Sequence, residues 1–206
     1  MDRVKRGLAQ TALRVAVERG VPNLNRRSLL TVAIGVATLI IATAVATAAT
    51  VTCTTSPCVG TPEADNISGT GADEIIKGLA GKDQILDESG SDQIFGGRGD
   101  DRINADTLLE RTLDGDDEVH GGIGDDYMIG AGGDDLLIGG EGRDQLEARD
   151  NAYAGDPGVG EDVVKGGPGR DDVQAFDSQF DRIDCGDGRD SASADETDVL
   201  RHCENS

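Results

Sequence analysis

Acidic side chains recur every nine residues through the middle of this chain, and each stands two positions before a large aliphatic residue. In GLAGKDQIL (78–86) and GGRGDDRIN (96–104), the fourth residue is Gly, the sixth is Asp and the eighth is Ile. Calcium is a hard cation that takes about six to eight oxygen ligands from carboxylates and backbone carbonyls. The spacing therefore predicts a row of calcium sites. The predicted ligands are Asp65, Asp73, Glu74, Asp83, Asp92, Asp101, Asp117, Asp126, Asp135, Asp144, Asp162 and Asp171.

Three units depart from the pattern. Glu74 has a longer side chain that moves its carboxylate, and Asp73 beside it could take its place by a one-residue slip. Asp87 and Thr112 stand where other units begin with Gly, which we treat as a mild departure. A solvated turn Asp next to Gly is the ordinary alternative for any single acid. The shared phase and the aliphatic residue that accompanies each acid favour metal binding.

Such acids need a repeating element that holds them at a fixed spacing. Side chains of a β-strand alternate between its two faces, so residues seven to nine of each unit predict a short strand with only the eighth residue in the core. Glycines allow the tight turns between strands. Two units then complete one turn of about 18 residues, and every second unit stacks on the same side. The predicted core residues are Ile67, Ile76, Ile85, Ile94, Ile103, Val119, Met128, Leu137, Leu146, Val164 and Val173.

The repeats fall into two blocks. The first covers residues 60–104 without a break, and residues 105–111 form an insertion. The second covers residues 112–174 and contains a degenerate stretch, 148–156, that we interpret as a loop. Stacking every second unit predicts which acids share an ion. The predicted groups are Asp65, Asp83 and Asp101; Glu74 (or Asp73) and Asp92; Asp117 and Asp135; and Asp126, Asp144 and Asp162.

The repeated unit resembles the nonapeptide G-G-x-G-x-D-x-U-x of the repeat-in-toxin (RTX) family, also called haemolysin-type calcium-binding repeats, where U is a large aliphatic residue. This resemblance implies an all-β fold, a right-handed parallel β-roll (β-solenoid) that binds Ca2+. One aliphatic residue in nine makes a core too small to offset the entropy of ordering the chain. We therefore expect calcium to supply folding free energy, and the calcium-free chain to be largely disordered.

Cysteine positions add a prediction about the ends of the β-roll. About seven turns would separate Cys53 and Cys58 from Cys185 and Cys203, which is roughly 30 Å at about 4.8 Å per strand. A disulfide tolerates only about 4.4–6.8 Å between Cα atoms. The β-roll therefore predicts the disulfides Cys53–Cys58 and Cys185–Cys203. A zinc site that includes His202 is the alternative, although the ligand spacing does not suit zinc.

Two segments are interpreted as caps, because the terminal units of a solenoid differ from the internal ones. Residues 50–59 form an N-terminal Cys cap, and residues 175–206 form a C-terminal cap. The C-terminal cap keeps the nine-residue phase in FDSQFDRID and CGDGRDSAS but loses the repeated glycines. We expect Phe176 and Phe180 to cover the last turn.

Residues 1–49 have the features of a signal peptide, with a basic n-region (1–28) and a hydrophobic segment (29–49) that ends in an Ala-rich sequence. The apolar run 29–51 is also long enough to remain as an uncleaved membrane anchor. The pair Arg26 and Arg27 leaves twin-arginine export open beside general secretion. We predict a protein that is secreted, extracellular or associated with the cell envelope, and that contacts a membrane only if this segment is not cleaved.

Charge and motif content restrict the function. Without residues 1–49 the chain keeps 38 acidic and 12 basic side chains, a net charge near -26. This charge excludes nucleic-acid binding and disfavours anionic membranes. His120 and His202 are the only histidines, neither lies in H-E-x-x-H, and no G-x-S-x-G is present. We therefore predict a calcium-binding protein that is not an enzyme.

The predicted role is structural or adhesive, with a cell-surface or matrix partner that the sequence does not identify. Two alternatives remain open. A calcium-dependent extracellular enzyme could use a pair of the acids on a glycoside. A calcium-dependent ice-binding solenoid would need a flat outward ladder of Thr pairs, whereas the outward positions are mixed Gln, Arg, Asp and Glu.

Overall fold

The computed structural model describes residues 48–106, 115–149 and 160–204. Nearly all of the expected signal peptide, most of the 105–111 insertion and most of the 148–156 loop lie outside these residues. The described chain is a parallel β-solenoid of about 8 turns that contains no helix, which confirms the predicted fold class. No segment of these three ranges is therefore a helix able to cross a membrane.

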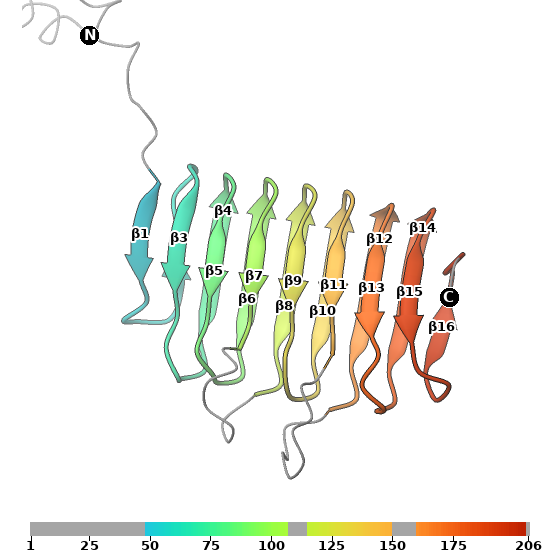
Figure 1. Cartoon of the computed structure of the whole chain (residues 1–206). Helices are drawn as coiled ribbons and strands as arrows, with labels where there is room; N and C mark the ends of the chain where they lie inside the picture. Colours follow the sequence, from blue (N-terminus) through green and yellow to red (C-terminus); the bar gives the residue numbers. More distant parts are fainter. Residues whose placement is uncertain (1–47, 107–114, 150–159, 205–206) are drawn as a thin grey trace, which may run out of the picture. The chain divides into compact units, whose positions relative to one another are not determined.

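Two eight-stranded parallel sheets face each other, and the chain alternates between them (Figure 1). The first sheet contains β1 (Ala49–Thr52), β3 (Asp65–Ser68), β5 (Gln84–Leu86), β7 (Arg102–Asn104), β9 (Tyr127–Ile129), β11 (Gln145–Glu147), β13 (Asp172–Ala175) and β15 (Ser191–Ala194). The second sheet contains β2 (Cys58–Val59), β4 (Ile75–Ala80), β6 (Gln93–Arg98), β8 (Glu118–Ile123), β10 (Leu136–Glu141), β12 (Val163–Gly169), β14 (Arg182–Gly188) and β16 (Val199–Arg201).

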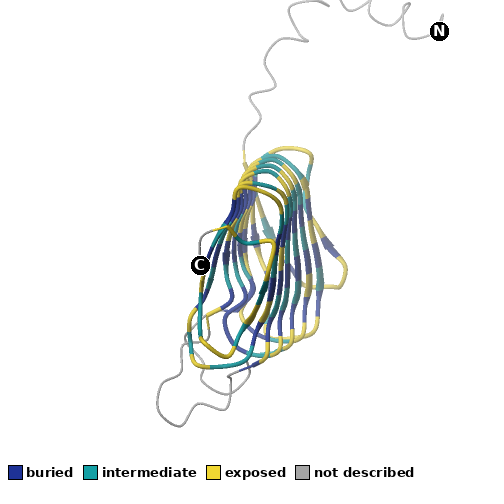
Figure 2. Ribbon diagram, turned by 90° about the vertical axis from the view of Figure 1, so that its right-hand side faces the viewer, coloured by how far each residue is buried: buried dark blue, intermediate teal, exposed yellow. Residues whose placement is uncertain are grey.

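The core is a double row of aliphatic side chains between the sheets. Strand register places the eighth residues of every second unit side by side, as in Ile67 with Ile85 and Ile85 with Ile103. Every predicted core residue is buried. Figure 2 shows buried positions recurring along the strands of the solenoid. Ile183 and Ala192 continue the rows beyond the predicted blocks.

The second glycine of a unit is required by the close approach of neighbouring turns. Gly122 has φ +117°, and a Cβ atom on it would lie 2.1 Å from the carbonyl oxygen of Gly97 in the preceding turn. Only glycine combines this backbone conformation with this contact. The glycine pattern therefore sets the tight spacing of the turns.

The sheets continue in register across both interruptions of the repeat. Ile94 pairs with Val119 across the first interruption, and Leu137 pairs with Val164 across the second. No strand therefore stands between β6 and β8 or between β10 and β12.

The second interruption overturns one predicted group of acids. Asp162 lies 27 residues beyond Asp135 and accepts the hydrogen bond of its backbone N–H, so these two acids stack on the same edge. The prediction that Asp162 follows Asp144 is therefore wrong. The interrupting segment has the length of one unit, and counting it as a half-turn moves every later unit to the wrong edge.

Disulfides close both ends, with the predicted pairing. Cys53 and Cys58 have Cα atoms 5.3 Å apart, and Cys185 and Cys203 have Cα atoms 5.2 Å apart. The first disulfide lies at the start of the core, where Cys58 pairs with Ile76 of the next turn. Each disulfide therefore staples a terminal turn.

The predicted aromatic cover at the C-terminal end is not formed. Phe176 is 63% exposed, and Phe180 lies against the guanidinium of Arg182, 4.7 Å from its ring centroid. The last turn is covered instead by β16, in which Leu200 pairs with Ile183 and packs on the core. The regular strands thus extend through the segment interpreted as a cap.

Candidate metal centres

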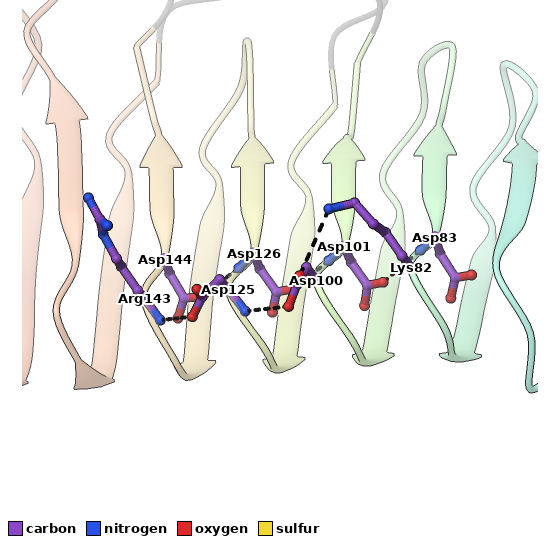
Figure 3. A network of polar contacts seen from close by, with 8 residues as sticks. All are labelled: Lys82, Asp83, Asp100, Asp101, Asp125, Asp126, Arg143 and Asp144. Carbon is purple, nitrogen blue, oxygen red and sulfur yellow. Dashed lines mark hydrogen bonds and ion pairs between the residues drawn. The ribbon is translucent and has the colours of Figure 1, made fainter.

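The sixth residues of the units form two acidic rows, one along each edge of the solenoid. All members are at most 7% exposed. The first acidic row contains Asp65, Asp83, Asp101, Asp126, Asp144, Asp171 and Asp190, and Figure 3 shows four of them side by side. The second acidic row contains Glu74, Asp92, Asp117, Asp135, Asp162 and Asp181. Among the predicted ligands, only Asp73 lies outside these rows.

Each row is held by hydrogen bonds between successive turns. The backbone N–H of Asp83 donates to Oδ1 of Asp101 at 2.9 Å, and the N–H of Asp101 donates to Oδ1 of Asp126 at 2.7 Å. The same bond recurs along both rows. From Asp83 onward in the first row and from Asp92 onward in the second, Oδ1 of each Asp therefore satisfies the backbone of the preceding turn. Asp65 differs, because Thr61 donates to both of its carboxylate oxygens.

The second carboxylate oxygen is buried and lacks a protein donor. No hydrogen-bond donor in the described residues reaches the Oδ2 atoms of Asp83, Asp92, Asp101, Asp117, Asp126, Asp144, Asp171, Asp181 and Asp190. A buried anionic oxygen without a partner is costly, because it has lost its water without a replacement. A regular series of such atoms indicates a ligand that repeats with the turns.

Other oxygens converge on the same places. A Cβ atom on Gly78 would lie 2.5 Å from Oδ2 of Asp83 and 2.5 Å from the carbonyl oxygen of Gly96 in the next turn. On Gly96, it would lie 2.6 Å from Oδ2 of Asp101 and 2.8 Å from the carbonyl oxygen of Gly121. Carboxylate and carbonyl oxygens around a space left by glycine are the donor set that calcium accepts. The residues present therefore fit calcium.

The electrostatics of the rows oppose ionisation without a cation. Burial is the main cause, and neighbouring acids add to it, while the hydrogen bond from the preceding backbone N–H acts in the opposite direction. The pKa rises to about 6 for Asp126 and Asp171, to about 7 for Asp101, Asp144 and Asp181, and to about 8 for Asp117. At neutral pH the carboxyl group with the highest of these pKa values, that of Asp117, is mostly protonated unless a cation binds beside it.

A second, exposed row of side chains runs beside the first acidic row and serves as a contrast (Figure 3). Its members are the fifth residues of the units. Here the later turn donates: the N–H of Arg143 bonds to Oδ1 of Asp125 at 2.9 Å. Asp100 is 58% exposed and lies 3.9 Å from Nζ of Lys82. These side chains are exposed to water, and their carboxylates bind the backbone N–H of the later turn. They do not form a buried site.

Asp73 belongs to the exposed positions. It is exposed, and its Oδ1 accepts the N–H of Ser91 at 3.2 Å. Glu74 is buried in the acidic row, and its two carboxylate oxygens accept the N–H and the hydroxyl of Thr70 at 2.8 Å and 2.7 Å. The one-residue slip that would replace Glu74 by Asp73 does not occur.

Sequence reasoning missed several acids of the rows. Asp181 and Asp190 are the sixth residues of FDSQFDRID and CGDGRDSAS, so their spacing was available as a signal. Asp198 accepts the N–H of Asp181 at 3.0 Å, and Glu204 accepts that of Asp190, so these two end the rows. Asp87 is fully buried, although it is a first residue, not a sixth. The only signal for Asp87 in the sequence was that it stands where other units begin with Gly.

His120 lies apart from these rows. Its ring stacks on Phe95 with centroids 4.9 Å apart, and Nε2 lies 2.8 Å from Oε1 of Glu118. It lies in β8 and is half-buried there. These contacts explain its presence on the second sheet without a ligand.

Comparison with known proteins agrees with this geometry. Residues 59–106 and 112–146 match the RTX calcium-binding nonapeptide repeat, in four copies. These segments are therefore RTX calcium-binding nonapeptide repeats, which bind Ca2+, and the chain is a calcium-binding β-roll protein. No curated protein and no solved structure matches the chain.

Proposed function

We propose that this protein is exported and folds outside the cell when calcium binds between its turns, and that the folded roll has a structural or adhesive role. The observation that carries the proposal is the pair of buried acidic rows. No Lys, Arg or His side chain is buried among residues 48–106, 115–149 and 160–204. The charge of the rows therefore has no buried basic partner.

Buried carboxylates that face each other at the spacing of β-strands repel strongly in a medium of low dielectric constant. A thin core cannot offset this repulsion together with the conformational entropy of the chain. Calcium between successive turns neutralises the carboxylates and completes the coordination of Oδ2. Binding free energy then becomes folding free energy, so the calcium-free chain is largely unfolded.

Export and an extracellular role rest on the sequence of residues 1–49. A signal peptide directs the chain to a compartment where disulfides form, which accords with the two disulfides at its ends. Calcium-coupled folding suits such a route, because the chain stays unfolded in a calcium-poor cytosol and folds after export.

Neither alternative function gains a supporting observation. A glycosidase needs two accessible carboxyl groups, whereas the acidic rows are buried and hydrogen-bonded to backbone N–H groups. An ice-binding face needs repeated Thr pairs, and in the described strands such a pair occurs only in β1, at Thr50 and Thr52. A scaffold or adhesive role requires neither feature.

Far-UV circular dichroism of residues 50–206 tests the proposal, by titration with calcium and with magnesium as a control. We expect a coil-to-β transition with calcium that magnesium does not reproduce and that a chelator reverses. A chain that is already folded in chelator, or that does not respond to calcium, contradicts the proposal. Recovery of the disulfide-bonded protein outside the producing cells tests export separately.

A further inference from the structure

One place in the second acidic row differs from all the others. Asp87 is the first residue of its unit, where the neighbouring units have glycine, and its side chain is 0% exposed. Its carboxylate lies within the row together with those of Glu74 and Asp92. One oxygen from each of the three carboxylates lies within 4.8 Å of the other two. Glu74 and Asp92 are 7% and 1% exposed, so the whole cluster is buried.

The preceding turn is built to admit the Asp87 carboxylate. A Cβ atom on Gly69 would lie 1.9 Å from Oδ1 of Asp87 and 2.5 Å from its Cγ. Gly78 and Gly96 lie beside the first acidic row. There, the equivalent space is approached by a carbonyl oxygen of the next turn. At Gly69 the nearest atoms are those of the Asp87 carboxylate. A carboxylate oxygen of a side chain therefore lies where the other edge has a backbone carbonyl oxygen.

The oxygens of this cluster are only partly used by the protein. Oδ1 of Asp87 accepts the N–H of Glu88 at 2.8 Å, and Thr70 donates to both oxygens of Glu74. Oδ2 of Asp87 and Oδ2 of Asp92 are buried and are reached by no hydrogen-bond donor of the described residues. Two carboxylate oxygens without a donor in one buried cluster point to a cation as the missing partner.

We propose that Glu74, Asp87 and Asp92 form a three-carboxylate divalent-cation site that differs from the other sites of the roll and binds calcium most tightly. The proposal rests on the calcium-binding function proposed above and assigns an additional ligand, Asp87. Affinity of an oxygen-ligand site rises with the number of charged ligands. This site is therefore the first to fill, and it orders β4, β5 and β6 before the remaining turns.

Calcium binding by the full mature chain tests the inference, measured by isothermal titration calorimetry and by competition with a chromophoric chelator. The variants are Asp87→Asn, Gly69→Ala and, as a matched control, Glu88→Gln, which removes one exposed charge from the adjacent residue. We expect the unmodified protein to hold one ion on the order of tenfold more tightly than the rest. Asp87→Asn and Gly69→Ala should both lose this tight ion, whereas Glu88→Gln should keep it.

The result separates this inference from the proposed function. If Asp87→Asn still folds with calcium and lacks only the tight ion, both stand. If Asp87→Asn binds calcium as the unmodified protein does, the three-carboxylate site is refuted while calcium-coupled folding remains. In that case Asp87 and Asp92 share a proton and do not bind a cation. The number of protons released when calcium is added should then be the same for Asp87→Asn and for the unmodified protein. An unmodified protein that binds no calcium refutes the proposed function itself.

Discussion

Replacing Asp101 by Asn should change stability in opposite directions with and without calcium. Asn keeps the size of the side chain and an oxygen that can accept the N–H of Asp83, but it removes the charge from a position that is 2% exposed. Asp100, the preceding residue, is 58% exposed. Asp100→Asn therefore removes the same charge from the surface and serves as the matched control (Figure 3).

The magnitude follows from the pKa of Asp101. Burial raises this pKa from 3.8 to about 7. Above that pH, the ionised group opposes folding by on the order of 4 kcal/mol, and residual solvation reduces this to about 2–4 kcal/mol. Asp101→Asn should therefore favour the calcium-free fold by that amount. In calcium it should cost about 2.7 kcal/mol, if one ion held at a hundred times its dissociation constant is lost.

Two titrations measure the change in stability separately with and without calcium. Urea unfolding in saturating calcium gives the loss, and folding by trimethylamine N-oxide in chelator gives the gain, because this osmolyte folds chains that are otherwise disordered. Asp100→Asn should change the free energy of unfolding by less than about 0.5 kcal/mol in either titration. Destabilisation by Asp101→Asn in both media, or equal behaviour of the two variants, would refute the role given to the buried charge.

Other predictions address protons, the core and the C-terminal end. Calcium affinity should fall as the pH decreases from about 8 to about 6, because protons compete for acids whose pKa is raised by burial, as in Asp117. In chelator the sign reverses, because a raised folded-state pKa favours folding below about pH 4, and this stabilisation is lost as the pH rises to about 6–8. By circular dichroism, a calcium midpoint that is independent of pH would contradict the first expectation, and a β content in chelator that is independent of pH would contradict the second. Leu137→Ala should cost about 2–5 kcal/mol in calcium, against less for the half-buried neighbour in Leu136→Ala, and equal urea midpoints would count against the core assignment. Replacing Cys185 and Cys203 by Ser should increase hydrogen exchange in β14–β16 and leave β4–β10 protected, and uniform deprotection would contradict the local stapling of this end.

The repeat predicts the fold because each level of the sequence agrees with the next. A single aliphatic residue, such as Ile94, fixes the inward face of its strand, and the nine-residue phase fixes the partner two units later. This is why the strands, the core and both disulfides could be predicted without a structure. The same phase failed where the interrupting segment has the length of one unit, as between Asp144 and Asp162, since length alone does not show whether a segment adds a half-turn.

The candidate sites were predictable only in part. Position in the unit predicts the acids of the two rows, including Asp181 and Asp190, which were omitted because their units were assigned to the C-terminal cap. It does not predict Asp87, because the effect of an acid in place of glycine depends on the space that Gly69 leaves in the turn below. Nor does it predict that Glu204 ends a row, because that residue belongs to no unit and reaches Asp190 through the C-terminal fold.

The most direct test of calcium bound by the acidic rows is a crystal structure of the calcium-loaded protein with an anomalous difference map. We predict two lines of calcium peaks along the edges of the solenoid, each beside an Oδ2 atom such as those of Asp83, Asp101 and Asp126. A folded solenoid whose edges hold only water or no density beside these oxygens would contradict the account.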